Sequence, residues 1–387
     1  MTTSLSPPAG LLRSKPHFAH LDGLRGVAAV VVVAFHLLEA HATSHLDQIV
    51  NHGYLAVDFF FILSGFVIGY AYDDRWPRMS WRNFALRRLV RLQPMVVFGT
   101  LIGALFFYPG ASVVCPLVDQ TTLSHLLIVT VMGCLMLPVS VGYDVRGWQE
   151  TYPLNGPTWS LFFEYIANIL YALVLRRLPT WLLAVVVLAS AFATGQYLLT
   201  APGGDIVGGW ALTGHELRVG FTRLMFPFTA GLLLARWRPR LSVPHPFLVC
   251  SVLLVALLAM PRVGGADVRL NALYELGCIV AGFPLIIIIG ASALHEQHES
   301  SFACRFLGRI SYPLYITHYP IVYMYFAYVH GADAASPMGQ LALGVTVWAG
   351  CIAMAYVYTR CYDEPVRRWL TRRIWGAKDK TSKGQKD

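Results

Sequence analysis

Nearly continuous apolar runs divide this chain, at about 21–40, 54–72, 92–108, 123–138, 157–175, 180–199, 217–235, 246–261, 271–293, 312–330 and 339–360. A helix needs about 20 apolar residues to cross the hydrocarbon core of a bilayer, so runs of this length predict membrane-spanning helices. The chain has 387 residues, of which 56% are hydrophobic and 13% charged. The sequence therefore predicts an all-α integral membrane protein and excludes a soluble globular enzyme.

The basic residues orient these spans. The segment after the first run, Glu39 to His52, contains no Lys or Arg, whereas the segment after the second contains Arg75, Arg78, Arg82, Arg87, Arg88 and Arg91. Short cytoplasmic loops carry the excess of basic residues, so the first span starts inside, and counting back from the basic C-terminal segment also gives a cytoplasmic C-terminus. The two counts agree only if one run between Arg91 and Pro157 does not cross.

The run at 123–138 is the one that we predict not to cross, because it is short and begins with polar Ser124 and His125. The predicted fold is thus a polytopic bundle of about ten transmembrane helices plus one re-entrant or interfacial segment, with both termini cytoplasmic. Residues 1–20 form a cytoplasmic lead and residues 21–366 the membrane domain. Residues 367–387 are polar and lysine-rich, which predicts a disordered tail.

The charge balance fits a membrane partner. Thirty Lys and Arg against 21 Asp and Glu give +9, but the basic residues lie in short loops between apolar runs. This distribution favours lipid headgroups over nucleic acid as the partner. The seven cysteines form no CxxC pair, and no metal site is predicted.

Two ionisable residues lie in the first run, where burial of charge is costly and therefore suggests function. Arg25 and His36 are eleven residues apart, which places them on one helix face about 16 Å apart along the axis. The alternative is that Arg25 extends to the headgroups and His36 packs as an ordinary histidine.

The segment from His20 to His36 resembles the opening motif of the acyltransferase 3 integral-membrane acyltransferases, in which an Arg or Lys is followed, after ten residues, by a His. Further blocks resemble that family in its order: Gly53–Ile68 with Val57-Asp58 and Ser64-Gly65-Phe66, the basic stretch Arg87–Pro94, Trp159-Ser160-Leu161 with Glu164, and Tyr312–Pro320. After Glu164 the chain departs from the family's more polar continuation. The resemblance covers about His20 to Trp369.

The resemblance implies transfer of an acyl group, commonly acetyl, from cytoplasmic acyl-CoA to a hydroxyl of an extracytoplasmic or lipid-linked glycan. Some members acylate small molecules instead. It also implies a multi-pass protein of the bacterial inner membrane, with acyl-CoA as a co-substrate and no bound cofactor, and it leaves a homo-oligomer open. No SGNH domain follows the last span, so we expect the chain to complete the transfer alone or with a partner.

Candidate catalytic residues are His36, Glu164 and Asp58. A hydroxyl that attacks a thioester needs a base near neutral pH, and His36 fits that role or that of a covalent acyl carrier. Glu164 could orient His36 or bind a sugar hydroxyl, or it could form a structural salt bridge to Arg223. Asp58 is an intramembrane carboxylate that needs an Arg or His partner from another helix.

Four arginines are candidates for binding the phosphates of acyl-CoA: Arg25, Arg87, Arg88 and Arg91. Plain positive-inside topology is the alternative for the last three. Further residues are expected to line the pocket: Asp22, Ser64, Trp159, Arg223 and His318. Asp22 could instead be a helix N-cap, and His318 could only hydrogen-bond at the proline kink.

A second class of function uses the same residues. In a secondary transporter or glycan exporter, Arg25, His36, Asp58 and Glu164 would form a substrate or proton pathway. The arginine-rich loop beside the first span favours the acyltransferase. A non-catalytic scaffold would leave the buried ionisable residues unexplained.

Overall fold

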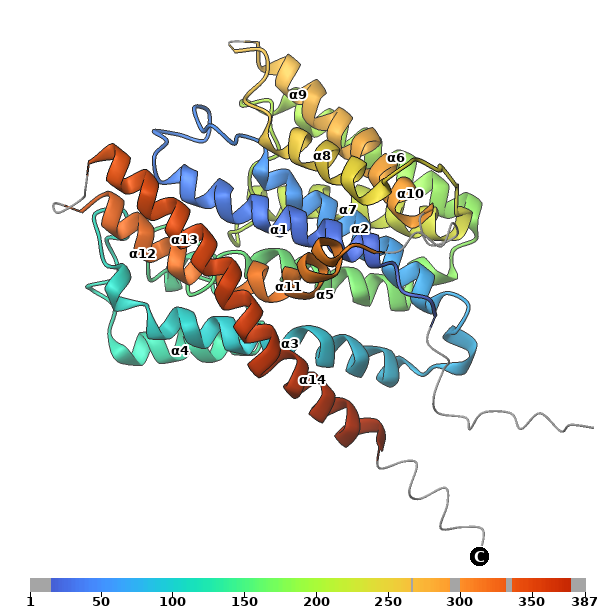
Figure 1. The fold of residues 1–387 in the computed structure, drawn as a ribbon, viewed down its shortest axis with the longest axis horizontal. Coiled ribbons are helices and arrows are strands. Elements are labelled where there is room, and N and C mark those ends of the chain that lie inside the picture. The colour runs from blue at the N-terminus through green and yellow to red at the C-terminus, as the bar shows by residue number, and fades with distance from the viewer. Residues whose placement is uncertain (1–14, 266, 293–299, 332–335, 377–387) are drawn as a thin grey trace, which may run out of the picture.

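A computed structural model describes residues 15–265, 267–292, 300–331 and 336–376, and in this part of the chain the regular structure is helical (Figure 1). The α-helices are α1 (Ala19–Glu39), α2 (Ala56–Tyr72), α3 (Trp81–Leu105), α4 (Leu123–Cys134), α5 (Thr158–Leu173), α6 (Thr180–Thr200), α7 (Gly214–Trp237), α8 (Pro246–Ala259), α9 (Val268–Gly277), α10 (Phe283–Ser292), α11 (Phe302–Thr317), α12 (Tyr319–Val329), α13 (Pro337–Tyr358) and α14 (Glu364–Thr371). Short π-helical turns join α9 to α10 and α13 to α14.

Eight helical stretches of the described residues are long and apolar enough to cross a membrane: Ala19–Glu39, Gly53–Tyr72, Trp81–Leu105, Thr158–Arg177, Thr180–Thr200, Gly214–Trp237, Val268–Ser292 and Pro337–Gly376. The shorter apolar α8 and the broken pair α11–α12 lie among them in the bundle (Figure 1). The prediction of a polytopic all-α membrane protein is confirmed.

Helix α4 is, like α8, one of the shorter apolar helices. Its 12 residues extend about 18 Å, well short of the roughly 30 Å hydrocarbon core. It lies against α3, where Gly133 meets Thr100, and the Gln93 side chain donates to Cys134 O at 2.6 Å. The chain then continues to α5 without another α-helix. That this segment does not cross the membrane stays a prediction.

The apolar run at 312–330, which we predicted as one span, is broken at His318 and begins earlier, at Phe302. Pro320 has no N–H, so the carbonyl of Ile316 lacks the helical partner four residues later. That carbonyl instead accepts from Asn155 Nδ2 at 2.8 Å. The loop before α5 therefore stabilises a helix break in the middle of the bundle.

The tail prediction is wrong for its first part. Helix α13 continues through α14 and a π-helical turn to Gly376, so residues 367–376 are helical (Figure 1). The sequence shows no apolar run there, yet α14 is strongly amphipathic and packs beside α3. Residues 377–387, and residues 1–14 of the predicted lead, lie outside the described part of the chain.

Glycines set the closest helix crossings. A Cβ on Gly65 of α2 would lie 2.1 Å from Phe228 O of α7, and one on Gly231 of α7 would lie 2.1 Å from Ile62 O of α2. Helices α1 and α11 approach as closely at Gly26, whose Cβ would lie 2.2 Å from Leu307 O. Small residues allow such contact in membrane bundles. These crossings place the ionisable residues of four helices near the centre of the bundle.

Candidate active site

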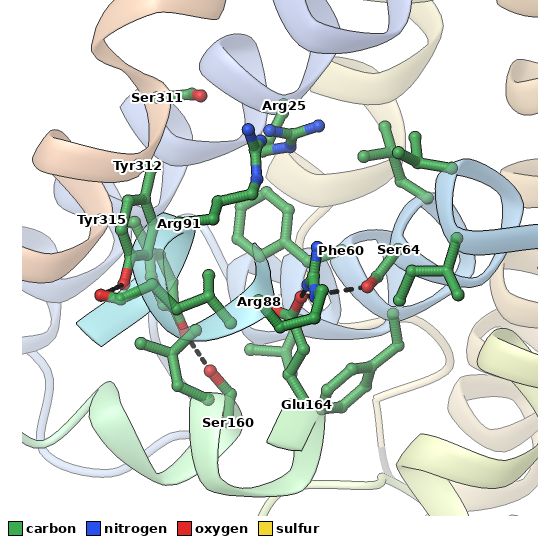
Figure 2. A pocket seen from close by; sticks show the side chains of 17 residues that line it. Arg25, Phe60, Ser64, Arg88, Arg91, Ser160, Glu164, Ser311, Tyr312 and Tyr315 are labelled. Carbon is green, nitrogen blue, oxygen red and sulfur yellow. Dashed lines mark hydrogen bonds and ion pairs between the residues drawn. The ribbon is translucent and has the colours of Figure 1, made fainter. Parts of the chain in front are cut away.

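The first of two central cavities, here the arginine cavity, is lined by polar residues from five helices: Arg25 of α1, Ser64 of α2, Arg88 and Arg91 of α3, Glu164 of α5, and Tyr312 and Tyr315 of α11. Figure 2 shows the guanidinium groups of Arg25, Arg88 and Arg91 projecting into it. Apolar side chains of α2 form much of the remaining wall. The cavity thus combines a cationic lining with an apolar wall.

Glu164 pairs with Arg88, so the predicted alternative of a salt bridge to Arg223 is wrong. Arg88 Nη2 lies 2.5 Å from Glu164 Oε1, and Ser64 Oγ donates to the same oxygen at 3.1 Å (Figure 2). Arg88 is only 7% exposed. In this arrangement Glu164 neutralises one of the arginines proposed to bind phosphate, and it makes no described hydrogen bond to His36.

We expect Glu164→Gln to lower turnover while the protein stays folded, because the amide keeps the shape but loses the charge that holds Arg88. A double-mutant cycle on stability between Glu164→Gln and Arg88→Gln should give a coupling of about 1–3 kcal/mol. Arg91→Gln is the matched control, because Arg91 lines the same cavity without a described bond to Glu164. Equal coupling to both arginines would contradict the pairing.

Asp58 and Arg223 form a buried ion pair between α2 and α7. Arg223 Nη2 and Nε lie 2.8 and 3.2 Å from Asp58 Oδ2, and both side chains are at most 1% exposed. Arg223 also donates to Tyr54 O and Gly208 O, and its guanidinium lies 5.2 Å from the centre of the Trp159 ring. Asp58, a predicted catalytic residue, lines neither central cavity; the contacts make it the counter-ion of Arg223.

The second central cavity, here the histidine cavity, has a volume of about 350 Å³. Its polar and aromatic lining comes from α1, α5, α7 and α12 and from the segments that join α1 to α2, α4 to α5 and α6 to α7: His36, Glu39, His45, Tyr54, Trp148, Glu150, Trp159, Trp210, Arg223 and Tyr319. Glu150 lies between α4 and α5, outside the spanning helices, and accepts from Tyr323. Burial raises the pKa of Glu150 to about 7.

His36 has a carboxylate partner that the sequence analysis missed. His36 Nδ1 lies 2.9 Å from Glu39 Oε2. With the proton on Nδ1 donated to this carboxylate, Nε2 keeps its lone pair and can accept a proton. Glu39 lies three residues after His36 on the same helix face, so the spacing could have indicated the pair.

His318 supports His36 from the helix break. Its ring stacks on the His36 ring with centroids 5.6 Å apart, and its Nδ1 lies 3.1 and 3.0 Å from the carbonyl oxygens of Leu314 and Tyr315. The predicted hydrogen bond at the proline kink is therefore present. His318 does not line the histidine cavity itself; it packs behind His36, which does.

The two cavities meet at Val57 and Tyr315, which line both. The Tyr315 hydroxyl lies 2.7 Å from Ser160 Oγ at this junction (Figure 2). Helix α1 thus presents Arg25 to one cavity and His36 to the other, as their shared face predicts. In the part of the chain that the structure describes, neither of these two cavities is lined by both residues.

Asp22 and Arg87 do not have the contacts that the sequence predicts for them. Asp22 is not an N-cap: α1 begins at Ala19 with Phe18 as its N-cap, and Asp22 pairs with Arg25 and His17. Arg87 lies outside both central cavities, with its guanidinium 5.0 Å from the centre of the Trp375 ring. Of the four arginines predicted to bind acyl-CoA, Arg25, Arg88 and Arg91 line the arginine cavity, and Arg87 lines a separate cavity beside α14.

Comparison with known proteins identifies the class of protein that carries this arrangement. The family model described as an acyltransferase domain matches residues 18–356. Protein 2 in the picA locus of Rhizobium radiobacter is 34% identical over 44% of this chain and 84% of its own length. The peptidoglycan O-acetyltransferase OatA of Listeria monocytogenes is 26% identical over 80% of this chain and 50% of its own length.

The O-acetyltransferase OatA of Staphylococcus aureus is 26% identical over 90% of this chain and 57% of its own length. The chain thus spans about half the length of the two OatA relatives. No solved structure is significantly similar to it. Because the match of the family model covers nearly the whole membrane domain, the chain belongs to the acyltransferase 3 family of integral-membrane acyltransferases.

Proposed function

We propose that this protein transfers an acyl group, most simply acetyl, from cytoplasmic acyl-CoA to a hydroxyl of a glycan at the outer face of a bacterial inner membrane. The observation that carries the proposal is the course of α1, which places Arg25 in the arginine cavity and His36 in the histidine cavity. The cavities meet at Val57 and Tyr315. A donor held at one end can therefore present its thioester at the other.

The sidedness follows from charge. Arginines gather where α3 begins and α14 ends, and the positive-inside rule assigns this end to the cytoplasm. The arginine cavity lies toward that end, and its cationic lining suits the phosphates of CoA. The pantetheine arm would pass Tyr315 toward His36, which is about 16 Å from Arg25 along the helix axis.

His36 has the contacts of a general base. Its Nε2 would take the proton of the acceptor hydroxyl as the oxygen attacks the thioester carbonyl, while Glu39 at Nδ1 stabilises the imidazolium. When the tetrahedral intermediate collapses, the C–S bond breaks and the CoA thiolate takes the proton from His36. The products are an O-acyl ester and CoA–SH.

The lining of the histidine cavity supports a sugar as the acceptor. Trp148, Trp159 and Trp210 offer aromatic faces, and Glu150 offers a buried carboxyl group that can bond a hydroxyl. The OatA relatives, named O-acetyltransferase and peptidoglycan O-acetyltransferase, support acetyl transfer to a cell-envelope polysaccharide.

Deletion of the gene should remove ester-linked acyl groups from an envelope glycan, as measured by mass spectrometry, and purified protein should transfer label from acyl-CoA. The acyl content of secreted small molecules is compared in the same way between the parent and the deletion strain. Altered glycan export with an unchanged ester content would favour a transporter. A mass increase on His36 in protein incubated with acyl-CoA alone would replace base catalysis by a covalent acyl-histidine.

A further inference from the structure

A third cavity, here the tail cleft, lies where α14 and the following π-helical turn pass α3, and has a volume of about 560 Å³. Its lining contains five arginines, two from α3 and three from the tail: Arg87, Arg91, Arg367, Arg368 and Arg372. Tyr72 and Trp375 add aromatic faces. This is the segment that the sequence predicted to be disordered.

The described residues compensate only part of the positive charge of the tail cleft: Arg367 Nη2 lies 2.7 Å from Asp363 Oδ2, and Arg368 lies 3.9 Å from Glu364 Oε2. Glu364 is its only lining carboxylate, and Arg309 from outside the cleft binds both oxygens of Glu364 at 2.5 and 2.7 Å. Arg91 and Arg372 make no hydrogen bond or ion pair within the described part of the chain. Such a concentration of guanidinium groups favours an anion with several oxygens.

Two side-chain nitrogens of the cleft lack a hydrogen-bond acceptor. The Nε atoms of Arg87 and Arg367 are buried and have no hydrogen-bond partner. An unpaired buried donor costs free energy that a bound phosphate oxygen would recover. Beside them, the guanidinium of Arg87 lies over one face of the Trp375 ring, 5.0 Å from its centre, so a flat ligand in the cleft would use the other face.

The tail cleft adjoins the candidate active site, because the two share a lining residue. Arg91 lines both the tail cleft and the arginine cavity, and Arg367 lines both the cleft and a neighbouring cavity that contains Arg25. A ligand that occupies the cleft could therefore extend past Arg91 into the bundle. The anionic part of such a ligand would lie in the tail cleft, and a narrow uncharged part would enter the arginine cavity along its apolar wall.

We propose that the tail cleft binds the nucleotide end of acyl-CoA, with the adenine on Trp375 and the phosphates among the arginines of α3 and the tail. This assignment rests on the proposed function and extends it to residues of the C-terminal helix. The same phosphate chemistry is present in the headgroup of an anionic lipid, which the experiment below distinguishes. Arg91 would stand where the pantetheine arm enters the arginine cavity.

The test is direct binding of CoA, 3′-dephospho-CoA and acetyl-pantetheine to the full-length protein in detergent. Arg372→Ala and Trp375→Leu should each weaken CoA binding at least about tenfold. Arg372→Ala should also reduce the preference for CoA over 3′-dephospho-CoA, and neither variant should change the use of acetyl-pantetheine. The matched controls are Arg373→Ala and Trp369→Leu, which lie on the same helix and do not line the cleft.

Two results would overturn the assignment. The first is CoA binding by both cleft variants equal to that of the controls. The second is that the cleft variants lose binding to phosphatidylglycerol nanodiscs but keep their affinity for CoA. That result would make the cleft a binding site for anionic lipid. If the unmodified protein binds no CoA, acyl-CoA is not the donor and the proposed function is wrong. If the unmodified protein and both cleft variants bind CoA equally well, only the assignment of the cleft is wrong.

Discussion

His36→Ala is expected to abolish acyl transfer while CoA still binds. The His36 imidazole keeps Nε2 free to accept the hydroxyl proton in the histidine cavity, because Nδ1 is bonded to Glu39. Loss of a positioned general base typically lowers the rate by about 10²–10⁴-fold. The arginines proposed to bind phosphate line other cavities, so the substitution should leave their contacts intact.

The measurement is labelled acyl transfer over a range of acyl-CoA concentrations, together with direct CoA binding. Glu39→Gln should give an intermediate loss of kcat with little change in KM, because the amide can still orient the ring but no longer stabilises its positive charge. His330→Ala is the matched control, since His330 bonds the carbonyl of Phe326 and lines no central cavity. Turnover retained by His36→Ala would exclude the base mechanism.

The second large effect concerns stability. Asp58→Leu should strongly destabilise the protein, because it leaves Arg223 as a buried charge without its counter-ion. Removal of one partner of a buried ion pair typically costs about 3–5 kcal/mol. Both side chains are at most 1% exposed and lie between two helices held together at Gly65 and Gly231, so the structure has little freedom to rehydrate the guanidinium.

The double substitution Asp58→Leu with Arg223→Met should recover much of the loss, since no unpaired charge then remains. Thermal unfolding in detergent measures all variants. The control is Asp73→Asn, which removes the carboxylate bound by Arg236 at 2.8 Å where both side chains are partly exposed, and its effect should be smaller. A well-folded Asp58→Leu without activity would instead indicate a catalytic carboxylate.

The sequence by itself determined the membrane class, the number of apolar segments and the shared face of Arg25 and His36. These properties depend on hydropathy and on the helical repeat, which act within one segment. The prediction that α4 does not cross also came from the sequence, because the run is short and the positive-inside count conflicts with a crossing. The pairing of Glu39 with His36 could also have been predicted from the sequence, because residues three apart lie on the same face of a helix.

Only the tertiary structure decided which charges pair. Glu164 has Arg88 as its partner and Asp58 has Arg223, although the sequence offered Glu164 and Arg223 as an equally reasonable pair. The choice depends on which helices approach, and that is set by close contacts such as Gly65 with Phe228 O. The break at His318 depends likewise on Asn155, which donates to the carbonyl of Ile316, 161 residues away, that Pro320 leaves free. The helical tail follows the same rule: its polar sequence has no apolar run to mark a helix, and it is ordered because α13 continues into it and α3 packs against it.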